Sequence, residues 1–269
     1  MAGLALEEHG SGRPLVLVHG LATTRVVWRR VLPRLAAQRR VITLDVPGFG
    51  QSPAAGPGFA LAQVADRIAA GLEPLDEPFD IVGHSMGGAV ALTFATRHPE
   101  RVGRLVLVAP AGLRPLPALS ARAFGAAAER AIPLRRRGAA LADFGWGRRL
   151  LMTPGTADPA SIPPSEVRAL LAASRGATRI AEALSTVVSA DLRPLLARLP
   201  LPVGAVWGTR DRIVPSGGIH TVLSLRPEAA TATVGGAGHI AMVERPGPFA
   251  DALDDVLSRL GNIRPAVSA

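Results

Sequence analysis

The stretch Phe79-Asp80-Ile81-Val82-Gly83-His84-Ser85-Met86-Gly87-Gly88 decides the fold of this chain. A short apolar run enters a Gly-x-Ser-x-Gly sequence and an Ala-rich segment leaves it, an order that predicts a strand, a tight turn at Ser85 and a helix. Such a turn brings backbone segments so close that a Cβ at Gly83 or Gly87 would clash. The helix after Ser85 would direct its free N–H groups at any negative charge that forms there. An incidental serine in a glycine-rich turn fits the same five residues, so the rest of the chain has to decide.

Apolar runs and helical patterns alternate on both sides of this stretch. Parallel strands joined by right-handed helical crossovers produce that order, so we expect an α/β fold with a doubly wound, mostly parallel sheet. In such sheets ligands bind beyond the carboxyl ends of the strands. The predicted strands are 4–8, 14–18, 40–46, 79–82, 102–109, 202–207 and 230–234, and the predicted helices are 24–37, 61–75, 86–98, 192–199, 216–225 and 246–260.

The alternation stops at Gly112, and residues 113–190 contain helical patches at 118–130, 134–151, 165–174 and 178–189, separated by prolines. We interpret this segment as a helical cap inserted into a core of residues 1–112 and 191–262, with 263–269 as a flexible tail. The segment carries 11 arginines against 5 acidic residues, which places six of the nine net positive charges there. A solvated outer face is the favoured explanation, and the alternative is a patch that contacts anionic surfaces or steers anionic substrates.

The composition narrows the class of protein. A chain of 269 residues suits one large α/β domain with an insertion, and the absence of cysteine excludes disulfides, thiolate metal sites and a cysteine nucleophile. No signal peptide and no apolar run of membrane-spanning length are recognisable, so a cytoplasmic protein is the default expectation. All 30 basic residues are arginine and only 4% of the chain is aromatic, a pattern that lacks the stacking platforms of nucleic-acid binders.

A serine hydroxyl needs a base within hydrogen-bond reach, and the base needs a carboxylate that orients it. Asp211 follows the predicted strand 202–207, and His239 follows the predicted strand 230–234, so both should lie at the same edge of the sheet as Ser85. The chain order Ser, Asp, His is the one expected for this architecture. Of the six histidines, only His239 lies at a late strand end in a Gly-rich loop; the others are His9, His19, His84, His98 and His220.

Five stretches, in order and at compatible spacing, make the chain resemble the α/β-hydrolase superfamily, in its capped serine esterase and lipase branch, over nearly its whole length. They are His19-Gly20, Asp45-Val46-Pro47-Gly48-Phe49-Gly50-Gln51-Ser52, Gly83-His84-Ser85-Met86-Gly87-Gly88, Trp207-Gly208-Thr209-Arg210-Asp211-Arg212-Ile213-Val214-Pro215, and Gly238-His239-Ile240-Ala241-Met242-Val243-Glu244-Arg245-Pro246. The resemblance implies the α/β-hydrolase fold with a nucleophile at Ser85, a base at His239 and its acidic partner at Asp211.

The resemblance also implies an oxyanion hole made by the backbone N–H groups of Leu21 and Met86. His19 and Gly20 would support the first of these, with His19 bracing the loop, and His84 would have a structural or supporting role. Some relatives carry the acid after the strand that ends at Ala109, but Pro110-Ala111-Gly112 contains no carboxylate there. Asp191 and Glu244 are the weaker candidates for the acid.

Serine at position 85 argues against the haloalkane dehalogenase and epoxide hydrolase branches, which use Asp there. Ile240 after the histidine, in place of Trp, weakens a carbon–carbon hydrolase interpretation. We therefore expect a serine hydrolase without cofactor or metal that cleaves a carboxylic ester of a small or medium apolar substrate. The alternatives are a carbon–carbon hydrolase, lactonase or thioesterase with the same triad, a cofactor-free haloperoxidase or perhydrolase, and a non-catalytic ligand-binding member.

Overall fold

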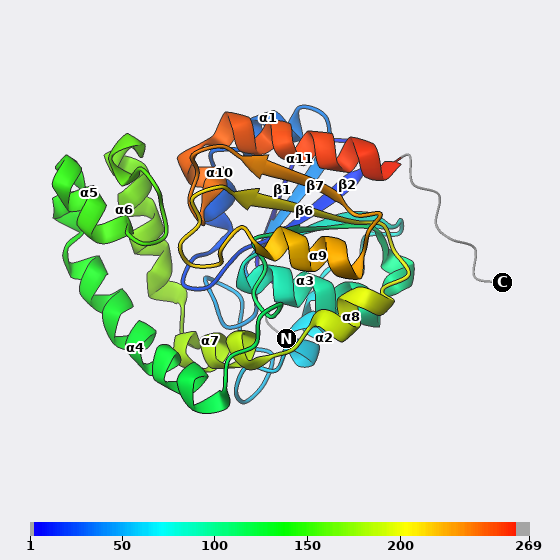
Figure 1. Ribbon diagram of the computed structural model, residues 1–269, viewed down its shortest axis with the longest axis horizontal. Coiled ribbons are helices and arrows are strands. Elements are labelled where there is room, and N and C mark those ends of the chain that lie inside the picture. The colour runs from blue at the N-terminus through cyan, green and yellow to red at the C-terminus, as the bar shows by residue number, and fades with distance from the viewer. Residues whose placement is uncertain (1–2, 262–269) are drawn as a thin grey trace.

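The computed structural model describes residues 3–261 of the chain. Its centre is a seven-stranded sheet in the order β1-β3-β2-β4-β5-β6-β7 (Figure 1). The edge strand β1 pairs with β3 in antiparallel fashion, and all other neighbouring strands are parallel. The doubly wound, mostly parallel sheet predicted above is thereby confirmed. The strands are β1 Leu6–His9, β2 Pro14–Val18, β3 Arg40–Leu44, β4 Phe79–His84, β5 Val102–Val108, β6 Val203–Gly208 and β7 Ala230–Val234.

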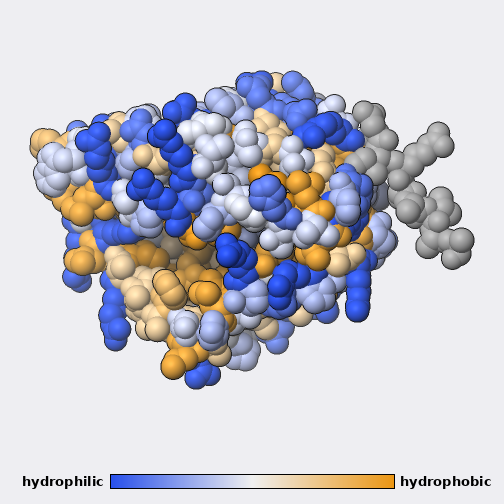
Figure 2. Space-filling model, viewed as in Figure 1, coloured by the Kyte–Doolittle hydropathy of each residue, from blue (hydrophilic) through white to orange (hydrophobic). Residues whose placement is uncertain are grey.

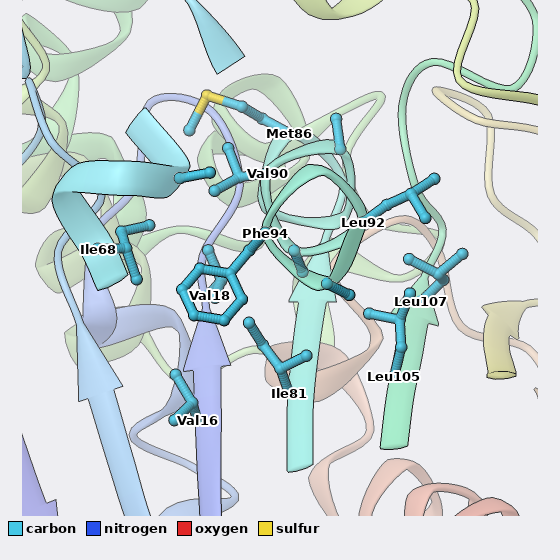
Figure 3. Close-up of a cluster of buried hydrophobic side chains, with 14 of the residues drawn as sticks. Val16, Val18, Ile68, Ile81, Met86, Val90, Leu92, Phe94, Leu105 and Leu107 are labelled. Atoms are coloured by element: carbon cyan, nitrogen blue, oxygen red, sulfur yellow. The ribbon is translucent and has the colours of Figure 1, made fainter. Parts of the chain in front are cut away.

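Helices cover both faces of the sheet because alternate strand side chains point to opposite sides. Apolar residues such as Val16, Val18 and Ile81 pack toward one helical layer, and their neighbours Leu15, Leu17 and Val82 pack toward the other. Figure 3 shows the first of these layers, in which Phe94 of α3 faces Val18 and Ile81 of the sheet. The first layer contains α2 Leu61–Gly71, α3 Met86–Arg97, α8 Arg193–Arg198 and α9 Gly218–Leu225, and the second contains α1 Leu32–Ala36, α10 Ala241–Glu244 and α11 Pro246–Gly261.

The predicted helix 24–37 is wrong as a single element. The structure has a 3₁₀ helix η1 at Arg25–Trp28 and a separate α1 that begins at Leu32 with a proline in its first turn. Because Pro33 has no N–H group, it cannot continue a helix from the preceding turn but is tolerated where a new helix begins. The predicted cap residue Thr24 does accept a hydrogen bond, 3.3 Å long, from the N–H of Val26.

Residues 113–190, called here the helical segment, contain four α-helices joined by 3₁₀ turns: α4 Ala118–Arg137, α5 Gly145–Met152, α6 Pro164–Ala173 and α7 Ile180–Ser189. The predicted break between the helical patches 118–130 and 134–151 is wrong, because the proline between them, Pro133, lies inside α4; the break comes at Gly138, just after α4. The arrowheads of β6 and β7 point toward the side on which the helical segment lies (Figure 1). Among residues 3–261, no helix is long and apolar enough to span a membrane.

Candidate active site

Ser85 stands in a strained turn between β4 and α3. Its φ of 54° and ψ of −117° are unusual for a residue with a side chain, and its N–H donates to Val108 O of β5 at 2.9 Å. A Cβ at Gly83 would lie 2.2 Å from Gly87 O, and a Cβ at Gly87 would lie 2.4 Å from His19 O. These distances agree with the clash that the Gly-x-Ser-x-Gly pattern predicts, and they show that only glycine fits both positions without a shift of backbone.

Asp211 and His239 meet although they lie 28 positions apart. The Nδ1 of His239 and Oδ2 of Asp211 are 2.7 Å apart, and both side chains are buried. The other carboxylate oxygen of Asp211 accepts the N–H groups of Ile213 and Val214 at 2.8 and 2.9 Å. Because the carboxylate can only accept, Nδ1 of His239 carries the proton and its Nε2 is left as the basic atom.

His84 packs directly on His239. The two ring centroids are 4.7 Å apart, and Nε2 of His84 donates to His239 O at 3.0 Å. Burial, and secondarily the neighbouring His239, hold the pKa of His84 well below its usual value of 6.5. His84 is therefore a neutral support that adds no positive charge beside His239. The supporting role of His84 stays a prediction, and its contact with His239 O was not predictable from the sequence.

His19 connects the loop after β2 to the end of β3. Its Nε2 accepts the N–H of Val46 at 2.9 Å, so Nδ1 carries the proton and donates to Gly20 O at 2.8 Å. Burial is the main cause that lowers the pKa of His19 to about 4, which keeps the ring neutral near pH 7. These two bonds connect the loop after β2 to Val46, and the bracing role of His19 stays a prediction.

The loop that contains Leu21 lies against the turn at Ser85. A Cβ on Gly20 would be 2.8 Å from His84 Nδ1 and 3.2 Å from Ser85 Cβ, so the loop backbone and the turn are in close contact. Met86 is the first residue of α3, and the first N–H groups of a helix have no acceptor within it. Leu21 directly follows Gly20 and Met86 directly follows Ser85, so the two backbone positions predicted to form an oxyanion hole belong to the two segments that are in contact here.

Glu244, named above as a weaker candidate for the acid, makes contacts that the sequence did not reveal. It is buried, and its carboxylate accepts N–H groups from Gly238 at 2.6 Å, from Ala157 at 3.2 Å and from Asp158. Gly238 directly precedes His239, and the other two donors belong to the helical segment. Glu244 therefore joins the His239 loop to the helical segment instead of pairing with the His239 side chain. The only sequence signal was a lone carboxylate in an apolar run.

Two cavities flank this edge of the sheet, and Figure 2 shows the hollowed surface beside α4. One has a volume of about 140 Å³ and lies between the helical segment and the loops; its lining includes Ala22, Thr23, Ile132, Leu151, Met152 and Ile240. The other, about 320 Å³, includes Pro110, Ala111, Trp207, Ile213 and Val214. Ala111 donates to Ser85 O at 3.0 Å, which places the second cavity next to the turn.

Among the residues described, no group of three or more His, Cys, Asp or Glu is arranged to hold a metal ion.

Comparison with known proteins shows which family the chain belongs to. Residues 13–246 match the family described as alpha/beta hydrolase fold. A pimeloyl-[acyl-carrier protein] methyl ester esterase of Edwardsiella ictaluri is 31% identical over 258 residues, covering 94% of this chain and 96% of the relative. A 2-hydroxymuconate semialdehyde hydrolase of Pseudomonas sp. is 43% identical over 113 residues, 40% of each chain. A thermophilic esterase from Thermogutta terrifontis has a TM-score of 0.73 at 26% identity, covering 96% of this chain and 93% of that one. A match over most of the chain and a full-length relative at this identity show that the protein belongs to the alpha/beta hydrolase family and is a hydrolase of that fold.

Proposed function

We propose that the protein is a cofactor-independent serine hydrolase that cleaves a carboxylic ester of a small or medium apolar substrate. The 2.7 Å hydrogen bond between His239 and Asp211 is the observation that carries this proposal. It orients a basic nitrogen at the same sheet edge as Ser85, which the positive-φ turn lifts out of the strand. A full-length relative named as a methyl ester esterase supports the ester as the bond that is cleaved.

The chemistry follows from the ring nitrogen of His239 that carries the proton: Nδ1 donates to Asp211, and Nε2 can accept a proton. Ser85 Oγ attacks the ester carbonyl while His239 Nε2 takes its proton, and Asp211 stabilises the resulting imidazolium. The N–H groups of Leu21 and Met86 bind the tetrahedral oxyanion, each contributing on the order of 3 kcal/mol to the transition state. The imidazolium then donates its proton to the leaving alcohol, and the same base activates water to release the acid from the acyl-enzyme.

The helical segment acts as a cap over this edge. Its residues Ile132, Leu151 and Met152 line the 140 Å³ cavity together with Ala22, Thr23 and Ile240, which adjoin Leu21 and His239. A mostly apolar lining beside a few polar catalytic groups is the usual composition of a small-molecule site. The core of residues 1–112 and 191–262 thus supplies the reacting groups, and the cap selects the part of the substrate that enters.

The proposal is tested with a short p-nitrophenyl ester and a fluorophosphonate probe on the full chain. Ser85→Ala is expected to abolish probe labelling and to reduce turnover by at least about 10³-fold, and His239→Ala to prevent labelling as well. Ser224→Ala, which changes an exposed serine on α9, is the matched control and should behave as the unaltered protein. Unchanged turnover in Ser85→Ala would overturn the proposal.

A substrate panel separates the remaining possibilities that use the same machinery. It contains lactones, thioesters, carbon–carbon ring-cleavage products and methyl esters of dicarboxylic acids, the last because relatives are named as pimeloyl-[acyl-carrier protein] methyl ester esterases. Turnover that depends on peroxide would indicate a perhydrolase. Tight ligand binding without probe labelling would indicate a non-catalytic member.

A further inference from the structure

An aromatic pair stands exposed at the outer end of the helical segment. The rings of Phe144 and Trp146 are stacked, with centroids 6.0 Å apart and an interplanar angle of 22°, although the residues are 55% and 58% exposed. Leu150, one turn further along α5, is 63% exposed. Large apolar side chains gathered on a surface in this way usually mark an interaction site. In Figure 2, hydrophobic and hydrophilic residues lie side by side at this end of the molecule.

Arginines alternate with these apolar residues. Leu134 of α4 is 66% exposed and is followed one turn later by exposed Arg137, and exposed Arg149 adjoins Leu150 on α5. Among the ion pairs of residues 3–261, none includes Arg137 or Arg149. These two guanidinium groups are therefore not paired with carboxylates, and the exposed Asp143 beside Phe144 pairs with Arg168. The interfacial patch, as we name it, consists of Leu134, Arg137, Phe144, Trp146, Arg149 and Leu150.

We propose that the interfacial patch docks the protein on an anionic phospholipid surface. Amphipathic aromatic rings favour the depth of the headgroups, and arginines bind the phosphates there. A second copy of this chain fits less well, because its patch would bring arginines against arginines. An acidic partner protein would match the arginines but would leave the stacked aromatic pair without a role. Because α4 and α5 also line the 140 Å³ cavity, docking would hold that cavity beside the lipid.

The three tryptophans make this proposal directly measurable. Trp28 and Trp207 are buried, and the chain has no tyrosine, so a change of intrinsic fluorescence on addition of vesicles reports on Trp146. Vesicles with 30% phosphatidylglycerol in phosphatidylcholine are expected to cause a blue shift, and brominated lipids to quench the emission. Trp146→Phe should lose the shift and keep co-flotation with the vesicles, because phenylalanine preserves the apolar contact.

Charge reversal tests the arginines against a matched site. Arg149→Glu is expected to lower the partition coefficient by at least about fivefold, because each basic residue near an anionic surface contributes about that factor. Arg198→Glu, an exposed arginine on α8, changes the net charge equally and should have little effect. The proposal would be overturned if Arg149→Glu and Arg198→Glu lowered the partition coefficient equally, or if the protein bound pure phosphatidylcholine vesicles as well as anionic ones. It would also be overturned if vesicles caused no shift of the Trp146 emission, or if a dimer formed without lipid and buried Trp146. Circular dichroism verifies the fold of each variant, and turnover of a soluble ester without vesicles tests the proposed activity separately.

Discussion

Removal of the Glu244 carboxylate should destabilise the protein because three backbone N–H groups lose their acceptor together. An unsatisfied buried donor costs about 1–3 kcal/mol, with the lower value where water has access. The bond from Gly238 is buried, whereas those from Ala157 and Asp158 are part-buried. Taking about 2 kcal/mol for the first and about 1 kcal/mol for each of the others, Glu244→Ala should lose about 4 kcal/mol. That is a large part of the total of about 5–15 kcal/mol that is typical of a folded protein.

Glu244→Gln refines the same argument. One carboxylate oxygen accepts from both Gly238 and Ala157, and the other accepts from Asp158. A carboxamide oxygen can keep the first two bonds, but its NH₂ group then faces the third donor. The glutamine variant is therefore expected to lose about half as much stability as the alanine variant.

Urea unfolding followed by circular dichroism measures these differences, and turnover of a soluble ester reports on the position of His239. Because Gly238 directly precedes His239, the proposed base, kcat in Glu244→Ala should fall by about tenfold or more even where the protein is fully folded. Asp255→Ala, which removes an exposed carboxylate of α11 that pairs with Arg259, is the control and should change stability by less than about 1 kcal/mol. A loss in Glu244→Ala no greater than in this control would refute the reasoning.

Three further predictions concern the turn, the acid and pH. Asp211→Asn places an NH₂ group opposite His239 Nδ1, so that the proton moves to Nε2 and His239 can no longer accept a proton there. We expect kcat to fall by about 10³–10⁴-fold with little change in thermal stability. An unchanged kcat would exclude Asp211 as the acid. The pKa of His19 is about 4 and that of His84 is also lowered, so on acidification these histidines take up protons in the unfolded chain before they do in the folded protein. Urea unfolding should therefore show full stability above about pH 6.5 and a loss of about 3 kcal/mol from His19 by pH 4. A stability that does not change with pH in this range would contradict the prediction. Gly83→Ala places a Cβ 2.2 Å from a backbone oxygen and should cost at least about 2 kcal/mol, whereas a fully stable variant in a melting experiment would show that the turn relaxes.

Local patterns were sufficient for much of the fold. Period-2 and continuous apolar runs located all seven strands to within about two residues at most of their ends. This was possible because a buried strand needs apolar side chains, and these are visible in the sequence. The turn at Ser85 was equally predictable, since its glycines are demanded by backbone contacts within the same few residues. Because Ser85, Asp211 and His239 each follow a predicted strand, all three could be assigned to the carboxyl edge of a parallel sheet.

The details that depend on distant partners were not predictable. Glu244 accepts N–H groups from residues more than 80 positions away in the helical segment, and a backbone donor carries no residue-specific signal. The contact of His84 with His239, 155 positions apart, is of the same kind. Pro133 lies within α4, where the local preference for a break is overridden, and α4 packs along α7. Local sequence was thus sufficient to select the residues of the proposed triad. Their supporting contacts, the cavities and the exposed aromatic pair were decided by tertiary packing, because only packing determines which polar groups find partners and which apolar groups remain uncovered.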